Sequence, residues 1–170
     1  MHNVRPVEAL DTTEFRRLMS LFTTGVCVVA VNGDDGAISA MTVNSFVSVS
    51  LDPMLVCWSL QNASSQFDLY AGAPRFAVSI LGASQAGLAA RYASRGDSQL
   101  IESDFVRSEQ GLPVIAGAIG YLDCSRWSTY EAGDHTMIFG EVLGLSDDRP
   151  DEQQAQPLTF FDGQFSRIDR

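Results

Sequence analysis

Two polar segments of this chain could bind a small ligand, because each places hydrogen-bonding side chains where a predicted strand meets a loop. Residues 39–46 read Ser-Ala-Met-Thr-Val-Asn-Ser-Phe, and residues 59–65 read Ser-Leu-Gln-Asn-Ala-Ser-Ser. The second segment also enters a predicted helix over residues 64–70. The first backbone N–H groups of such a helix, together with serine hydroxyls, can hold an anion. Asn62 or Ser64 could instead cap the helix, and the segment alone leaves both interpretations open.

Histidine and cysteine residues indicate which other chemistries are disfavoured. Only His2 and His135 could supply imidazole ligands, and the three cysteines, Cys27, Cys57 and Cys124, are widely spaced, so we expect no zinc site. Each cysteine lies in an apolar run, which predicts buried free thiols in a reducing cytoplasm. No Gly-x-Ser-x-Gly elbow accompanies His135, which disfavours a serine hydrolase. The sequence also has neither a Gly-x-Gly-x-x-Gly turn after a strand nor a Walker phosphate-binding loop.

The elements that must position the two polar segments are predicted to be mainly strands. Apolar and β-branched runs predict a hairpin over residues 26–43, strands over 46–50, 54–60 and 76–81, two long strands within 117–145 that turn at Ala132-Gly133-Asp134, and a last strand over 158–168. Residues 96–116 are expected to be irregular. Helices do not separate these strands regularly, which favours an antiparallel barrel over a parallel sheet.

Short helices are predicted at the periphery of this barrel. Phe15, Leu18, Met19 and Phe22 share one face of a helix, and residues 83–95 also show helical spacing. We expect one domain over residues 1–170, with its core at about residues 12–168.

Composition and charge exclude several classes of partner. The net charge of −10 repels phosphate backbones, so we expect no nucleic-acid partner. The N-terminus lacks the pattern of a signal peptide, and apolar stretches are shorter than the about 20 residues that cross a bilayer as a helix. We therefore expect a cytoplasmic protein without a membrane partner.

Residues 41–53, Met-Thr-Val-Asn-Ser-Phe-Val-Ser-Val-Ser-Leu-Asp-Pro, resemble the signature of the short-chain flavin reductases, which share an FMN-binding split barrel. The resemblance continues in order through residues 57–60, 76–81, 132–142 and 157–161. Its most specific piece is Gly-Asp-His-Thr at residues 133–136. Because it runs over roughly residues 12–168, the resemblance is stronger than any isolated motif.

The resemblance implies a homodimer of mainly β, antiparallel Greek-key split barrels with short peripheral helices. It implies that FMN or FAD is reduced with NADH or NADPH, and that the reduced flavin passes to a partner monooxygenase. His135 would act on the nicotinamide side, in binding and orientation. The residues that would contact flavin lie in three segments: Thr42, Val43, Asn44 and Ser45; Ser59, Leu60, Gln61, Ser64 and Ser65; and Ser79, Ile80 and Leu81.

Alternatives remain open at the level of the sequence. A flavoprotein ferric reductase or a non-enzymatic flavin carrier could use the same barrel. Arg91 and Arg95, four residues apart on the predicted helix, could face a phosphate or lie on a solvated surface. Trp58 and Trp127 could cover a flavin or pack in the protein core. The choices between FMN and FAD, and between NADH and NADPH, also stay open.

Overall fold

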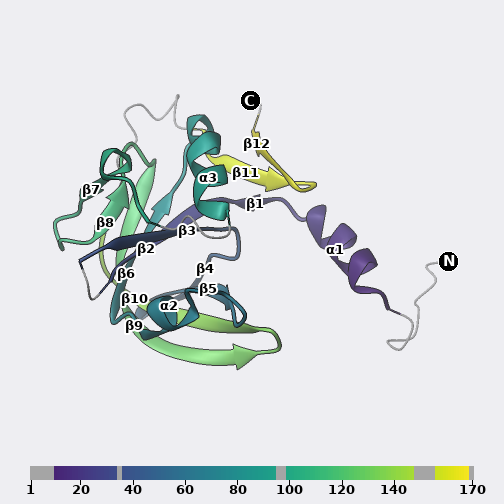
Figure 1. Cartoon of the computed structure of the whole chain (residues 1–170), viewed down its shortest axis with the longest axis horizontal. Helices are drawn as coiled ribbons and strands as arrows, with labels where there is room; N and C mark the ends of the chain where they lie inside the picture. The colour runs from purple at the N-terminus through teal and green to yellow at the C-terminus, as the bar shows by residue number, and fades with distance from the viewer. Residues whose placement is uncertain (1–9, 34–35, 95–98, 148–155, 169–170) are drawn as a thin grey trace.

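The computed structural model describes residues 10–33, 36–94, 99–147 and 156–168, and within them the chain is built around one large antiparallel sheet (Figure 1). Its seven strands lie in the order β3-β2-β6-β9-β10-β5-β4. Their bounds are β2 (Cys27–Asn32), β3 (Ile38–Val43), β4 (Val47–Leu51), β5 (Met54–Gln61), β6 (Arg75–Ile80), β9 (Gly120–Ala132) and β10 (His135–Ser146). β3 and β4 are therefore the two edges of this sheet.

Two small sheets and short helices surround the large sheet. One sheet contains β1 (Thr24–Gly25), β11 (Leu158–Phe161) and β12 (Gln164–Arg167), and the other contains β7 (Phe105–Arg107) and β8 (Pro113–Ile115). The helices are α1 (Thr12–Ser20), α2 (Phe67–Gly72) and α3 (Ala86–Ala93), with 3₁₀ turns η2 (Ala83–Gln85) and η3 (Glu102–Asp104). All strand pairs among the described residues are antiparallel, so the predicted mainly β, antiparallel fold is confirmed.

The core has two parts because β2 is covered on both faces, which explains its unbroken run of buried residues. Val29 and Val31 belong to one part, and Val28 and Ala30 belong to the other. In the first part, the buried Trp58 ring packs edge-on against Tyr70 and Phe76, at ring-centre distances of 5.9 and 6.1 Å. Trp58 is thus a core residue, as one of its two sequence interpretations predicts.

Gly140 of β10 leaves room for the side chain of Phe76, which comes from β6 on the other side of β9. A Cβ atom at this position would lie 2.5 Å from Cζ of Phe76 on β6. Because the Phe76 ring is itself packed against Trp58, it has little room to move away. The glycine is therefore required by packing.

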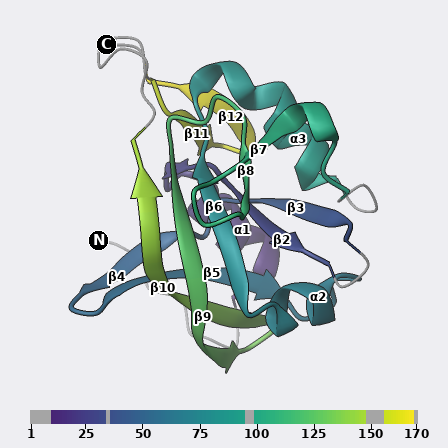
Figure 2. The ribbon, with the colours of Figure 1, turned by 90° about the vertical axis from the view of Figure 1, so that its left-hand side faces the viewer.

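Several predicted elements are confirmed, and others are corrected. The 26–43 hairpin and the two long strands that turn at Ala132-Gly133-Asp134 are present, and Gly133 adopts a positive φ of 66° (Figure 2). The single strand predicted over 158–168 is wrong, because Asp162 and Gly163, both with positive φ, turn the chain from β11 into β12. The prediction that residues 96–116 are irregular is wrong where η3, β7 and β8 lie, and its first residues, 96–98, fall outside the described residues.

α1 and β4 leave their apolar side chains exposed in the single chain. α1 projects from the body of the protein (Figure 1), and none of its residues is buried. Phe15 and Leu18 are each 64% exposed. The half-buried strand predicted at residues 46–50 is β4, and it is more exposed than predicted because it forms an edge of the sheet that no other described strand covers.

The remaining predicted features concern cysteines and membranes. Cys27, Cys57 and Cys124 are all buried free thiols, as predicted, and burial raises the pKa of Cys27 and of Cys124 to about 12. Among the described helices, none combines the length and the apolar character that a membrane crossing demands.

Candidate functional site

A cavity of about 400 Å³ lies between the edge strand β3, the loop after β5 and the C-terminal end of α3. Its volume falls within the range of small-molecule sites in proteins, roughly 300–1,000 Å³. We call it the β3–α3 cavity. The lining residues are Ala40, Met41 and Thr42 of β3; Leu60 and Gln61 of β5; Ala63, Ser64, Ser65 and Gln66 of the loop; and Tyr92, Ala93 and Ser94 at the end of α3.

The loop after β5 offers unused polar groups to this cavity. α2 begins at Phe67 with Gln66 as its N-cap and no side-chain capping bond, so neither Asn62 nor Ser64 caps it. Ser64 Oγ instead accepts a hydrogen bond from the Gln66 N–H at 3.3 Å. Within the part of the chain that the structure describes, the Ser65 hydroxyl has no hydrogen-bond partner. Ser65 is therefore available to a ligand.

Residues 42–45, where the chain leaves β3, lie between the β3–α3 cavity and a second cavity. Thr42 Oγ1 donates to the carbonyl of Ala89 at 2.8 Å, which attaches β3 to α3. Val43 is buried in the core. The amide of Asn44 is exposed and has no partner among the described residues. The Ser45 hydroxyl is occupied, because it accepts the Ser59 N–H at 3.0 Å and thereby ties the end of β3 to β5.

The second cavity, of about 430 Å³, separates α1 from the body of the protein, and we call it the α1 cavity. Its walls combine large apolar side chains with polar ones, among them Asn44 and Ser45. The lining residues are Phe15, Arg16, Met19 and Ser20 of α1; Phe22 and Thr24 after it; Asn44 and Ser45; and Phe160 and Gly163. Residues 42–45 thus contribute Thr42 to one cavity and Asn44 and Ser45 to the other.

His135 is the first residue of β10 and lies beside the β3–α3 cavity. Its pairing partner in β5 is Gln61, which lines that cavity. The Nδ1 atom of His135 lies 2.8 Å from Asp134 Oδ1, and this hydrogen bond lowers the pKa of the Asp134 carboxyl below its usual range. The His135 side chain is 39% exposed. A neighbouring carboxylate therefore orients an imidazole that a ligand can reach.

Asn62 holds the turn before His135 against the end of β5. Asn62 Oδ1 accepts the Thr136 hydroxyl at 2.8 Å, and the Asn62 N–H donates to the carbonyl of Asp134 at 2.9 Å. These bonds fix the position of His135 relative to the cavity. They also give Asn62 a structural role that the sequence did not predict.

The third predicted segment, Ser79, Ile80 and Leu81, lies away from the lining of both cavities. Ser79 is buried, and its Oγ accepts the Ile115 N–H at 2.9 Å. Leu81 is also buried, and its N–H donates to the carbonyl of Val26. The assignment of these three residues to flavin binding stays a prediction that rests on the resemblance.

Sequence reasoning did not identify the cavity wall that α3 supplies, Tyr92, Ala93 and Ser94. The sequence signal available was only the predicted helix over residues 83–95. Arg91 forms an ion pair with Asp104 at 2.6 Å, and Arg95 lies outside the described residues. Trp127 is 54% exposed and lines neither cavity. Among the residues that the structure describes, no three His, Cys, Asp or Glu side chains gather as a metal site.

Comparisons with known proteins agree with the resemblance seen in the sequence. A family model described as the flavin reductase like domain matches residues 19–169. The FMN reductase (NADH) SmoA of Agrobacterium fabrum is 41% identical over 160 residues, which cover 94% of this chain and 88% of SmoA. The flavin-dependent monooxygenase reductase subunit HsaB of Rhodococcus jostii is 32% identical over 162 residues, which cover 95% of this chain and 80% of HsaB.

The solved structures include the NADH:FAD oxidoreductase SgcE6 of Streptomyces globisporus, in complex with NAD and FAD fragments. It superposes with a TM-score of 0.85 at 35% identity and covers 98% of both chains. The predicted split-barrel fold and the predicted class of enzyme are confirmed by these similarities. The chain belongs to the flavin reductase like family.

Proposed function

We propose that this chain transfers a hydride from NADH to FMN or FAD and releases the reduced flavin to a partner monooxygenase. The observation that carries the proposal is the β3–α3 cavity, with its unused polar groups, in a chain of the flavin reductase like family. The relatives SmoA and HsaB support the hydride donor and the class of partner, respectively. We also propose that residues 12–168 form one domain.

The residues around the β3–α3 cavity fit a flavin nucleotide. When bound, the flavin supplies a ring system that accepts the hydride. The hydroxyls of Ser64 and Ser65 suit its phosphate, since hydroxyl and backbone donors can bind an anion without a lysine or arginine. β3 is an edge of the large sheet, and among the described residues its outer side is bridged to Gln99 only at Ser39, so N–H groups nearer its end can donate to ring carbonyls. Asn44, which lines the adjoining α1 cavity, adds an amide. Such donors stabilise negative charge that develops on those carbonyls.

His135 is proposed to bind and orient the nicotinamide. Hydride transfer needs the donor and acceptor atoms about 3–3.5 Å apart, so positioning is the main task of the protein. No proton has to leave the nicotinamide donor, and His135 therefore need not act as a general base. The bond between Asp134 and His135, with the anchoring of this turn by Asn62, supports a positioning role.

A homodimer is proposed because the single chain exposes large apolar side chains on three elements. They are Phe15, Leu18 and Phe22 in and after α1, Leu51 of β4, and Trp127 and Tyr130 of β9. Exposed apolar surface of this extent is typical of interfaces. A cytoplasmic location is proposed from the three buried free thiols.

The decisive experiment follows NADH absorbance after purified protein is mixed with FMN or FAD. We expect NADH oxidation that saturates with flavin, because the flavin is a dissociating substrate in this proposal. The same assay with NADPH and with each flavin measures both preferences. NADH oxidation no faster than the background without enzyme would contradict the proposal and favour a flavin carrier. Retention of one flavin per chain, with electrons passed to a ferric chelate, would favour the ferric reductase alternative.

A further inference from the structure

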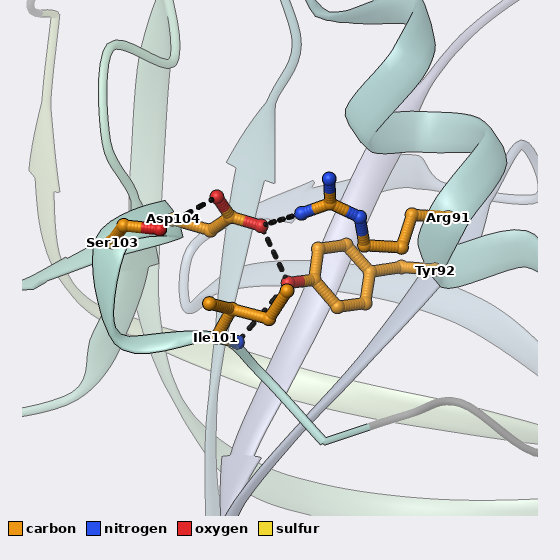
Figure 3. A network of polar contacts seen from close by, with 5 residues as sticks. All are labelled: Arg91, Tyr92, Ile101, Ser103 and Asp104. Carbon is orange, nitrogen blue, oxygen red and sulfur yellow. Dashed lines mark hydrogen bonds and ion pairs between the residues drawn. The ribbon is translucent and has the colours of Figure 1, made fainter.

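Tyr92, a wall residue of the β3–α3 cavity, is held by a network of polar contacts that converges on Asp104 (Figure 3). The Tyr92 hydroxyl donates to Asp104 Oδ2 at 2.7 Å and accepts the Ile101 N–H at 3.2 Å. Arg91 Nη1 donates to the same Asp104 oxygen at 2.6 Å. Two adjacent residues of α3 are thus bound to a single carboxylate.

The main chain around Asp104 is itself fixed. Its N–H donates to the carbonyl of Ile101 at 2.9 Å, and its carbonyl accepts the Ala116 N–H at 2.9 Å. Ala116 directly follows β8. Asp104 is therefore anchored independently of α3, and its carboxylate can hold the helix in place.

The Tyr92 phenol is suited to this bond because the ring is only 2% exposed. Burial raises the pKa of Tyr92, so the hydroxyl remains protonated and donates at neutral pH. A hydrogen bond to a carboxylate is stronger than one between neutral groups. Arg91 balances the charge of Asp104, whose side chain is 16% exposed.

α3 is also attached to β3, because Thr42 Oγ1 donates to the carbonyl of Ala89. The helix is thus held between β3 and Asp104, and its last residues form the cavity wall together with Ser94. A ligand binds more tightly to a cavity whose wall is already ordered, because less side-chain freedom is lost on binding.

We propose that Asp104 is a positioning residue for flavin binding, which holds Tyr92 and the end of α3 against the cavity without touching the flavin. The inference rests on the proposed function, in that the flavin occupies this cavity. Asp104 then sets the affinity for flavin and leaves the hydride-transfer step unchanged.

The test compares Asp104→Asn with wild type by direct titration of FMN, followed by flavin fluorescence without NADH. Asparagine keeps the shape of the side chain and removes its charge. We expect the FMN dissociation constant to rise about tenfold, which matches loss of one charge-assisted hydrogen bond. At saturating FMN, kcat and the KM for NADH stay within about twofold of wild type.

A second single variant keeps the proposal falsifiable if Asp104→Asn folds poorly. Tyr92→Phe removes only the hydroxyl and is expected to weaken FMN binding by a similar factor. The double variant is expected to bind FMN no more weakly than the weaker single variant, because both changes remove the same bond. Glu102→Gln, an exposed carboxyl on the same turn, is the matched control and leaves FMN binding unchanged.

Several outcomes would overturn the inference. The first is an FMN affinity within twofold of wild type in both Asp104→Asn and Tyr92→Phe. The second is a double variant in which the losses of FMN affinity add. The third is a fall in kcat at saturating FMN. If these appear while wild type binds FMN and oxidises NADH, only the role of Asp104 fails. If wild type neither binds FMN nor oxidises NADH, the proposed function fails together with this inference.

Discussion

The two cavities beside residues 42–45 are built in different ways. The walls of the β3–α3 cavity are attached to the body of the protein by buried or specific contacts, such as Thr42 to Ala89 and Tyr92 to Asp104. One wall of the α1 cavity is a helix without a buried residue, on which Phe15 is 64% exposed. The contacts that hold the β3–α3 cavity come from within one chain, whereas the exposure of α1 supports the proposal that a second copy of the chain covers this helix.

The attachment of α1 supports this contrast. The contacts of Ser20 with Asp162 hold the C-terminal end of the helix: the Asp162 N–H donates to the Ser20 carbonyl at 2.9 Å, and the Ser20 hydroxyl donates to Asp162 Oδ1 at 3.3 Å. Apolar side chains along the helix, including Phe15 and Leu18, nevertheless remain exposed. Flavin affinity is therefore expected to depend on the β3–α3 cavity, and assembly on α1.

The largest effect is expected from Ser64→Ala combined with Ser65→Ala. Each lost hydroxyl donor to a charged phosphate costs about 1.5–3 kcal/mol, so the loss of two would raise the FMN dissociation constant at least about 150-fold. Riboflavin, which has no phosphate, is expected to bind both proteins equally. Fluorescence titration of the two flavins measures this difference. Ser48→Ala with Ser50→Ala, on β4, is the matched control. Equal weakening of FMN and riboflavin would contradict the assignment of the phosphate to these serines.

A smaller effect is expected from Leu18→Glu on the exposed face of α1. In the proposed dimer a second chain would bury the Leu18 side chain, so a charge there is expected to cost at least about 1.5 kcal/mol and to raise the dimer dissociation constant about tenfold or more. Sedimentation analysis over a range of concentrations measures it. Thr13→Glu adds the same charge to the opposite face of the helix and leaves assembly unchanged. If monomeric Leu18→Glu binds FMN more weakly than wild type, flavin affinity depends on α1 as well, and the distinction between the two cavities fails.

The smallest effect is expected from His135→Ala, next to the β3–α3 cavity. Loss of one orienting hydrogen bond, worth about 1 kcal/mol, would raise the KM for NADH about fivefold. The FMN dissociation constant is expected to stay unchanged. Steady-state kinetics at saturating FMN, together with FMN titration, separate the two quantities. Turnover equal to wild type at every NADH concentration would remove the role of His135.

Local patterns in the sequence predicted most of the strands and turns. The 26–43 hairpin follows from β-branched runs on both sides of a polar turn, and the β9–β10 turn follows from Gly133. The division of β11 from β12 was missed, because Asp162 and Gly163 turn the chain inside an otherwise strand-like run. The exposure of α1 could not be predicted either, since an apolar face does not reveal whether its own chain or a second one covers it.

The sequence correctly singled out polar residues near strand ends that line the β3–α3 cavity, namely Thr42, Ser64 and Ser65. Contacts between distant segments were not predictable. Tyr92 and Asp104 are 12 residues apart, and the hydroxyl of Ser45 accepts a hydrogen bond from Ser59 on another strand. Such pairings are set by the tertiary fold, and no local spacing in one sequence encodes them.

The most direct test of the account is a crystal structure of the protein with FMN bound. The account predicts FMN in the β3–α3 cavity, with its phosphate within hydrogen-bond distance of Ser64 or Ser65 and its ring along residues 42–45. FMN bound elsewhere, or a cavity without flavin in crystals saturated with FMN, would contradict it.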